Sequence, residues 1–214
     1  MKIIVVYDNK LYSVLPGLKS DWGFSALISI DDKHILFDTG ANGNILIRNM
    51  TILGIDPLIV TDIFISHNHY DHVGGLSHFL NINNNVILHS PPSFRAVKNV
   101  NEIRYYDKPE KLYDNIFTSG ELDNIEQSLA IETGKGLKVI TGCSHPDMKD
   151  IFNSFSSFGK IKSIIGGFHN LSDFSVFSNL ELISPMHCTK HVGKIKEMYP
   201  NQYRIGGVGR TFTL

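Results

Sequence analysis

Four side chains able to bind a metal ion fall within six consecutive residues of this chain, in the segment 66–72, which reads SHNHYDH. In an extended segment alternate residues face the same way, so His67 and His69 converge on one ion. A turn then directs Asp71 and His72 toward a neighbouring point. Imidazole and carboxylate together suit Zn²⁺, Mn²⁺ or Fe²⁺ better than Ca²⁺ or Mg²⁺. A solvated His-rich loop is the alternative, but such a loop has no reason to show this order directly after an apolar strand.

Four further motifs accompany this H-x-H-x-D-H segment. They are Asp38-Thr39-Gly40, Gly142-Cys143-Ser144-His145, Gly166-Gly167-Phe168-His169 and Pro185-Met186-His187-Cys188-Thr189. The set resembles the metallo-β-lactamase fold superfamily over nearly the whole chain. It is similar to one branch of that superfamily, commonly named 7,8-dihydropterin-6-yl-methyl-4-(β-D-ribofuranosyl)aminobenzene 5′-phosphate synthase. The resemblance implies an α/β (α+β) fold, a four-layer αββα sandwich with the metal site at the rim where the loops of the two sheets meet.

The resemblance also implies two divalent metal ions, with zinc as the first expectation and manganese or iron as alternatives. It assigns the first ion to His67, His69 and His145, and the second ion to Asp71, His72 and His187. Many relatives have a metal-bridging Asp where this chain runs through Gly-Gly-Phe into His169. A neutral imidazole is a poor bridge between two cations, so His169 is expected to have a catalytic or substrate-binding role, with terminal metal binding as the alternative.

Other residues near these motifs have two interpretations each. Asp38 either forms a turn or orients a ligand histidine through its second N–H group, and the family pattern favours orientation. Thr189 is expected to contact the substrate. Cys143 and Cys188 both flank proposed ligands; thiolate is an excellent zinc ligand, yet small buried side chains are the favoured interpretation.

The elements that must position these residues alternate between strand-like and helix-like segments. Strands are predicted at Lys2–Tyr7, Gly23–Ile30, His34–Phe37, Asp62–Ser66, Val86–His89, Gln127–Glu132, Leu137–Thr141, Ser163–Ile165, Glu181–Ser184 and Tyr203–Leu214. Helices are predicted at 45–53, Val73–Leu80, Pro146–Phe158 and Thr189–Met198. Residues 91–118 are the least regular and are interpreted as an excursion, either a hairpin over a cleft or a peripheral loop. The chain reads as two similar halves that meet near residues 120–130, yet a single metallo-β-lactamase-like domain over residues 1–214 is the economical interpretation.

Composition excludes several classes of protein. The 214 residues are 42% hydrophobic and 19% charged, as in a globular protein rather than a disordered or fibrous one. Two cysteines are too few for a disulfide scaffold, and no apolar stretch approaches the length of a membrane span. A net charge of −1 provides no general attraction for nucleic acid or an anionic membrane. We expect a cytoplasmic protein that binds neither; a homodimer remains open.

These residues together predict a metal-dependent enzyme. A metal pair with an open coordination position activates water, Asp71 steers it, and His169 assists as charge develops. Four motif loops run into predicted helix starts, after Thr39-Gly40, after His72, at Pro146 and at Thr189, which favours an anion. The expected substrate is small, anionic and phosphorylated, pterin- or nucleotide-like, and reacts by hydrolysis or phosphate-linked group transfer. A di-iron-type redox protein and a non-catalytic metal-dependent ligand sensor are the alternatives.

Overall fold

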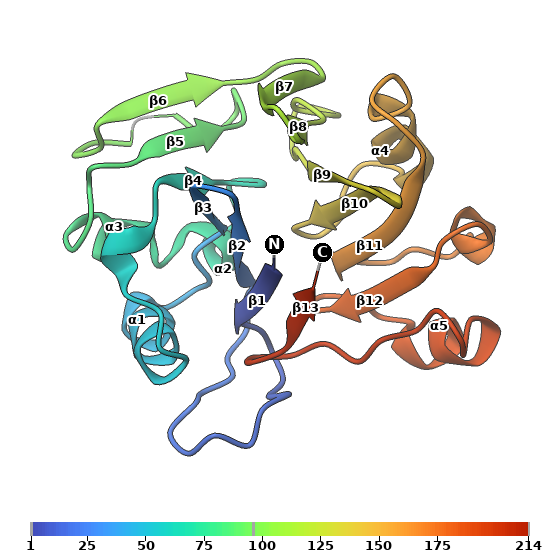
Figure 1. Cartoon of the computed structure of the whole chain (residues 1–214), viewed down its shortest axis with the longest axis horizontal. Coiled ribbons are helices and arrows are strands. Elements are labelled where there is room, and N and C mark those ends of the chain that lie inside the picture. The colour runs from blue at the N-terminus through green and yellow to red at the C-terminus, as the bar shows by residue number, and fades with distance from the viewer. Residues whose placement is uncertain (1, 96, 214) are drawn as a thin grey trace. The chain divides into compact units, whose positions relative to one another are not determined.

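The protein, described by a computed structural model for residues 2–95 and 97–213, divides into two compact units (Figure 1). The first unit comprises Met1–Tyr105 and Gly206–Leu214, and the second comprises Tyr106–Ile205. Each unit is built on one β-sheet with its own helices. The division between the units therefore falls at residues 105 and 106, before the interval 120–130 suggested by the sequence.

The sheet of the first unit has the strand order β13-β1-β2-β3-β4-β5-β6. Its strands are β1 (Lys2–Tyr7), β2 (Ser25–Ile30), β3 (Lys33–Phe37), β4 (Asp62–Phe64), β5 (Ile87–Ser90), β6 (Glu102–Tyr105) and β13 (Thr211–Thr213). Strands β1, β2 and β3 form an antiparallel meander, whereas β3, β4, β5 and β6 run parallel. Since parallel strands end at the same edge of a sheet, the segments that follow β3 and β4 are neighbours.

Helices of the first unit pack against this sheet. They are α1 (Gly43–Ile52), α2 (Tyr70–Val73) and α3 (Leu76–Leu80), with a short 3₁₀ turn η1 (Pro57–Ile59). The Asn42 side chain caps α1 by accepting two backbone N–H groups of the first turn. Leu46 and Met50 of α1 and Phe79 of α3 form one buried cluster with strand residues such as Ile63. The apolar spacing in the sequence thus predicted α1 correctly.

The sheet of the second unit has the strand order β12-β11-β10-β9-β8-β7. Its strands are β7 (Glu110–Tyr113), β8 (Ile116–Thr118), β9 (Leu129–Thr133), β10 (Gly136–Thr141), β11 (Ile161–Gly167) and β12 (Leu182–Met186). Strands β7 to β10 are antiparallel, and β10, β11 and β12 are parallel. The loops that follow β10, β11 and β12 consequently leave the same edge of this sheet.

The helices of the second unit are short. They are α4 (Met148–Ser154), α5 (Val192–Met198) and the 3₁₀ segment η2 (Phe174–Phe177). Ile151 of α4, Phe155 directly after α4 and Ile195 of α5 pack with strand residues such as Val139 in one buried cluster. Within residues 2–95 and 97–213, no helix combines the length and the apolar character that crossing a membrane requires.

The structure corrects three details of the prediction. Residues 91–118 are not one excursion: β6 completes the first sheet in parallel with β5, and β7 and β8 form a hairpin that opens the second sheet. The helix after the His-rich segment begins at Tyr70 rather than after His72. The last two helices begin at Met148 and Val192 rather than at Pro146 and Thr189. Except for α1, the helices after the motifs have seven residues or fewer, so the inference of anion binding from helix starts loses most of its support.

Candidate metal centre

The His-rich segment of the first unit begins where β4 ends. Ser66 and His67 continue the chain past the buried end of the strand, and His69 occupies the N-cap position of α2. Asp71 and His72 lie within this one-turn helix. The chain thus changes from extended to helical within the motif, at His69.

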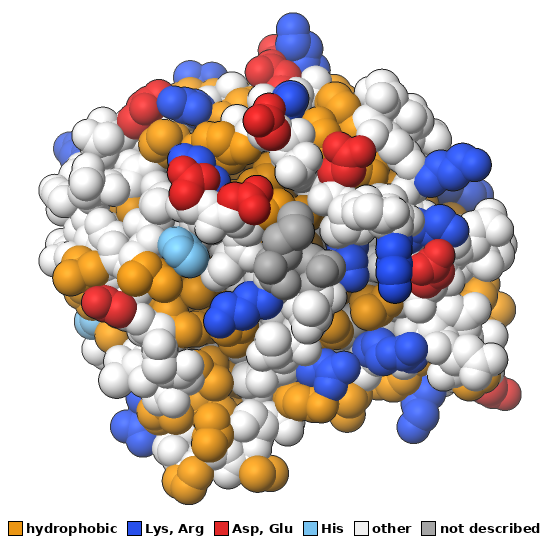
Figure 2. Space-filling model, in the orientation of Figure 1, with side chains coloured by type: hydrophobic (Ala, Val, Ile, Leu, Met, Phe, Trp, Pro, Cys, Tyr) orange, Lys and Arg blue, Asp and Glu red, His pale blue; other side chains and the backbone are white. Residues whose placement is uncertain are grey.

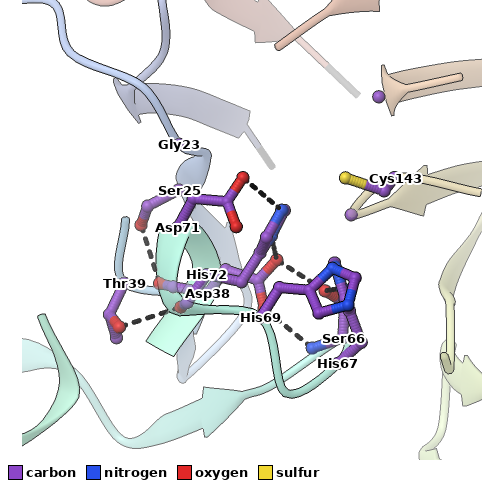
Figure 3. A network of polar contacts seen from close by, with 12 residues as sticks. Gly23, Ser25, Asp38, Thr39, Ser66, His67, His69, Asp71, His72 and Cys143 are labelled. Carbon is purple, nitrogen blue, oxygen red and sulfur yellow. Dashed lines mark hydrogen bonds and ion pairs between the residues drawn. The ribbon is translucent and has the colours of Figure 1, made fainter. Parts of the chain in front are cut away.

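One carboxylate organises this segment (Figure 3). Asp38 follows β3, is fully buried and has a left-handed backbone with φ of 54°. Its Oδ1 accepts the Ser66 N–H at 2.7 Å, and its Oδ2 accepts the Ser66 hydroxyl at 2.7 Å. The same Oδ2 lies 2.7 Å from Nδ1 of His72. Asp38 therefore joins the end of β3 to both halves of the His-rich segment.

The hydrogen bonds of Asp38 fix which nitrogen of each histidine is protonated. An ionised carboxylate only accepts, so Nδ1 of His72 carries the proton and its Nε2 keeps a lone pair. The single hydroxyl proton of Ser66 is used on Asp38, so Ser66 Oγ accepts the Nδ1–H of His67, at 2.9 Å. Nε2 of His67 is then also a lone-pair atom. Both imidazoles are thus held in the tautomer that binds a metal through Nε2.

The donor atoms of the segment form two close pairs. Nε2 of His67 and Nδ1 of His69 lie 3.0 Å apart, and Nε2 of His72 lies 3.8 Å from a carboxylate oxygen of Asp71. Two nitrogens bound to one zinc ion at about 2.0–2.1 Å in tetrahedral geometry are separated by about 3.3 Å. The spacing of His67 and His69 is therefore close to that of two ligands of one ion. A cation between them would release the proton that they share.

The loop 38–41 presses against the His-rich segment and holds it in place. The Thr39 N–H and hydroxyl both donate to the His72 carbonyl, at 2.8 and 2.9 Å. A Cβ on Gly74 would lie 2.3 Å from the Ala41 carbonyl oxygen, and one on Gly75 would lie 2.3 Å from the Thr39 carbonyl oxygen. The absence of side chains at these two glycines allows the backbone after α2 to contact the backbone of the loop 38–41 directly, so the two segments are packed tightly together.

In the second unit a different carboxylate organises the Gly-Cys-Ser-His motif. Glu126 is 1% exposed and accepts the backbone N–H groups of four consecutive residues, 142–145, at 2.9–3.1 Å. Hydrogen bonds to a charged acceptor are stronger than those between neutral groups. The turn includes Ser144 with φ of 57°, a conformation that costs energy for a non-glycine residue. Glu126 thus holds His145 and Cys143 on a rigid turn after β10.

His145 and His169 line one cavity of the second unit. Their ring centroids are 4.8 Å apart, and the cavity has a volume of about 260 Å³. Lys149 and Asp173 form an ion pair of 2.7 Å at the same cavity. A hydrogen bond from Lys149 lowers the pKa of the Asp173 carboxyl to about 2, and the same bond raises the pKa of Lys149. The cavity thus has two imidazoles, the Lys149 cation and the carboxylates of Asp147 and Asp173 on its walls.

His187 follows β12 with a left-handed backbone, φ of 50°, and is buried. One donor atom each from His187, Cys143 and Cys188 lie within 4.8 Å of one another. The hydroxyl of Thr189 donates to the Met186 carbonyl at 2.7 Å and accepts the N–H of residue 168 at 3.0 Å. Because the hydroxyl of Thr189 donates its proton to one backbone group and accepts from another, Thr189 joins the ends of β11 and β12.

The structure therefore brings the predicted site residues together in two sets, one in each unit. Asp38, His67, His69, Asp71 and His72 form the first set, and His145, His169, His187 and Thr189 belong to the second. The assignments of particular ions to ligands drawn from both sets stay predictions.

Sequence reasoning missed two residues that hold these sets. Ser66 transmits the effect of Asp38 to His67 through one hydroxyl. A serine directly before the first histidine of the motif was the available signal. Glu126 had a signal as well, because it is a charged residue shortly before the apolar run 129–131. A buried carboxylate needs several donors, and a tight turn offers them.

The fold and the motifs agree with the comparison to protein families. Residues 23–148, more than half of the chain, match the family model of the metallo-beta-lactamase superfamily. The chain belongs to this superfamily, and the resemblance inferred from the motifs is confirmed.

Two curated proteins of Methanocaldococcus jannaschii are similar to the chain over most of its length. An uncharacterised protein, MJ0448, is 29% identical over 97% of this chain and 98% of its own length. The 7,8-dihydropterin-6-methyl-4-(beta-D-ribofuranosyl)-aminobenzene-5′-phosphate synthase is 28% identical over 81% of this chain and 78% of its own length.

Solved structures share the fold. Tm1679, described as a metal-dependent hydrolase of the beta-lactamase superfamily, has a TM-score of 0.77 with 23% identity, covering 100% of this chain and 99% of its own. Zinc-bound PqqB from Methylobacterium extorquens has a TM-score of 0.63 with 11% identity over 100% of both chains. The predicted mixed α+β fold of the metallo-β-lactamase type is therefore confirmed.

Proposed function

We propose that the protein is a metal-dependent enzyme that acts on a small anionic substrate by hydrolysis or by phosphate-linked group transfer. One observation carries this proposal: Asp38 fixes His67 and His72 so that each presents a lone pair at Nε2. Fixing the tautomer and orientation of these histidines favours metal binding, because a histidine ligand must be neutral and must direct a lone pair at the ion.

The donor set fits a transition metal. Three imidazoles and one carboxylate suit zinc, manganese or iron, and hard oxygen-seeking cations prefer more carboxylates. We propose two divalent ions, zinc first, with His67, His69, Asp71 and His72 among the ligands. His145 and His187 are proposed as further ligands. A bound divalent ion supplies Lewis acidity, which polarises a phosphoryl or carbonyl oxygen and makes water a better nucleophile near neutral pH.

The chain's own residues have separate proposed roles. The side chain of Asp71 is 18% exposed, so it can accept a proton from the attacking water. His169 lines the cavity with His145 and is proposed to bind the substrate or to donate a proton to the leaving group. Asp38 and Ser66 do not touch the substrate; they position the imidazoles.

The proposed substrate is a small phosphorylated, pterin- or nucleotide-like molecule. The name of the 28% identical synthase describes a pterin phosphate, which supports this class. Cationic metal ions favour an anionic substrate. Charge argues against nucleic acid, because the net charge is −1 and Lys and Arg occur together with Asp and Glu on the face drawn in Figure 2.

Metal analysis combined with a substrate screen tests this proposal. Freshly purified protein is analysed for zinc, manganese and iron, and is assayed on phosphomonoesters, phosphodiesters and pterin phosphates. His67→Ala and Asp71→Ala are expected to lose metal and turnover together. His78→Ala is the matched control, since His78 is an exposed histidine of α3 in the same unit.

Three outcomes contradict the proposal. Full turnover in His67→Ala and Asp71→Ala excludes the assigned site. Tight ligand binding with no turnover across the panel favours the sensor alternative. Iron with a reversible visible spectrum and no hydrolysis favours the redox alternative.

A further inference from the structure

The loops after β10 and β12 meet over the end of the strand between them. Strand β11 lies between β10 and β12, and all three are parallel. Cys143 follows β10, whereas His187 and Cys188 follow β12. Both loops leave the same edge of the sheet, which brings one donor atom of each of these three residues within 4.8 Å of the other two.

A glycine at the end of β11 makes room for this cluster. A Cβ on Gly167 would lie 2.8 Å from the Cys188 sulfur and 3.1 Å from the Cys143 Cα. It would also lie 2.4 Å from the Gly142 carbonyl oxygen. Any larger residue at this position would displace the Cys188 side chain, so the space beside the two thiols depends on Gly167.

The three residues are held rigidly before any ligand binds. The Cys143 N–H donates to buried Glu126 at 2.9 Å, and the Cys188 sulfur lies 3.8 Å from the Cys143 carbonyl oxygen. His187 keeps its left-handed backbone with φ of 50°. Conformations of this kind persist only where the surrounding structure imposes them, and they concentrate at functional sites.

We propose that Cys143, His187 and Cys188 bind a soft divalent cation such as Zn²⁺ as a thiolate-rich site of the second unit. Two thiolates and one imidazole are a donor set that zinc accepts with a fourth position open to solvent or substrate. This proposal revises the sequence-based interpretation of the two cysteines as small buried side chains. It takes no donor from the first unit and shares only His187 with the ligands of the proposed function, so the two cysteines distinguish it from that function.

Cobalt substitution tests the sulfur ligands directly in the full chain. Co²⁺ added to the reduced, metal-free protein is expected to produce a near-ultraviolet thiolate-to-metal band. Cys143→Ser and Cys188→Ser are each expected to lose about half of this band, because one of two thiolates remains, and the double variant is expected to lose it entirely. The double variant His67→Ala with His69→Ala is expected to keep the band. A band that survives the double cysteine variant, or no band in the wild-type protein, overturns the proposal.

Alkylation of the wild-type protein provides a second measurement that does not depend on how the variants fold. Zn²⁺ or Cd²⁺ is expected to protect Cys188, the less buried of the two cysteines, from iodoacetamide, as measured by mass spectrometry, and Mg²⁺ is expected to give no protection. Equal labelling with and without Zn²⁺ overturns the proposal. If His67→Ala loses turnover but Zn²⁺ still protects the cysteine from alkylation, the thiolate site binds zinc without the His-rich segment, which supports the proposal.

Discussion

At the scale of single residues, the first unit depends on Asp38. Its carboxylate accepts from the Ser66 N–H, the Ser66 hydroxyl and His72 Nδ1, each at 2.7 Å. The side chain of asparagine has one acceptor oxygen and an amide group that cannot accept, so Asp38→Asn cannot satisfy all three donors. We infer that the charge and both oxygens of this residue are required to orient the two imidazoles.

Asp38→Asn is therefore expected to weaken zinc binding by roughly 10- to 100-fold, measured by chelator competition. Asp62→Asn is the matched control. Asp62 is a fully buried aspartate of β4 in the same sheet and lies 2.8 Å from Nε2 of buried His89, outside the His-rich segment. Its variant is expected to lose stability but not zinc affinity. Equal affinities in wild type and Asp38→Asn would remove the assigned role of Asp38.

Glu126 has the corresponding role in the second unit, because it satisfies four consecutive N–H groups. Glutamine in its place would leave at least one N–H facing an amide donor. Glu126→Gln is expected to lower the free energy of unfolding by about 1–3 kcal/mol, measured in urea. Glu132→Gln is the control, since Glu132 is an exposed residue of β9, and a change within about 0.5 kcal/mol is expected. A similar small change in both variants would show that the turn forms without Glu126.

Tyr7 gives a prediction about alkaline pH. Burial and a hydrogen bond of 3.1 Å to Asp21 raise the pKa of this tyrosine above its ordinary value. A group with a raised pKa contributes stability that is complete below its unfolded pKa, about 10, and is lost as pH rises toward the folded pKa. The free energy of unfolding, measured in urea, is expected to decrease less steeply above about pH 10 in Tyr7→Phe than in the wild-type protein. The exposed Tyr70, as Tyr70→Phe, is expected to keep the full slope.

At the scale of elements, the loop 38–41 must fit between β1 and the His-rich segment. A Cβ on Gly40 would lie 2.5–2.7 Å from the ring of Tyr7, and the φ of Gly40 is 64°. Gly54 has nearly the same φ, 70°, but a Cβ there would meet nothing within 4 Å. The two glycines therefore differ mainly in the space around them.

Gly40→Ala is expected to cost about 1–3 kcal/mol more than Gly54→Ala, because only the former adds a clash to the shared cost of a left-handed alanine. Urea unfolding of the two variants measures this difference. Gly40→Ala is also expected to weaken zinc binding, since the loop carries Asp38. Equal destabilisation by the two variants would mean that the Tyr7 ring moves aside freely.

Most elements could be predicted from the sequence, because local patterns determine them. Short apolar runs located β1 to β4, and helical spacing located α1. The division of residues 91–118 between two sheets was not predictable, since no local pattern shows that β6 joins the sheet of β5 while β7 and β8 open the other sheet. The hydrogen bonds of Ser66 and Glu126 were missed for the same reason. Their partners lie 28 and 16–19 residues away in the chain, and no local pattern records such contacts.

At the scale of the whole molecule, the fold does not determine the reaction. Tm1679, described as a hydrolase, and PqqB share this fold with the chain at 23% and 11% identity. The reaction is determined by the residues of the site and by the substrate they accept. The proposed metal binding connects these residues to the behaviour of the whole chain, because an ion that binds only the folded state also stabilises it.

Zinc is therefore expected to raise the stability of the protein by mass action. At a free zinc concentration 100 times the Kd, the increment is about 2.7 kcal/mol, which corresponds to a rise in Tm of roughly 5–10 °C for a chain of this size. A variant with tenfold weaker binding retains only about 1.4 kcal/mol at the same zinc concentration. Asp38→Asn is expected to show this reduced increment in a thermal melt, while Asp62→Asn keeps the full one. Ca²⁺ is expected to cause no shift, because imidazole ligands do not suit it. A zinc increment that is the same in wild type and in a His67→Ala, His69→Ala, Cys143→Ser and Cys188→Ser combination would mean that the ion binds through other residues.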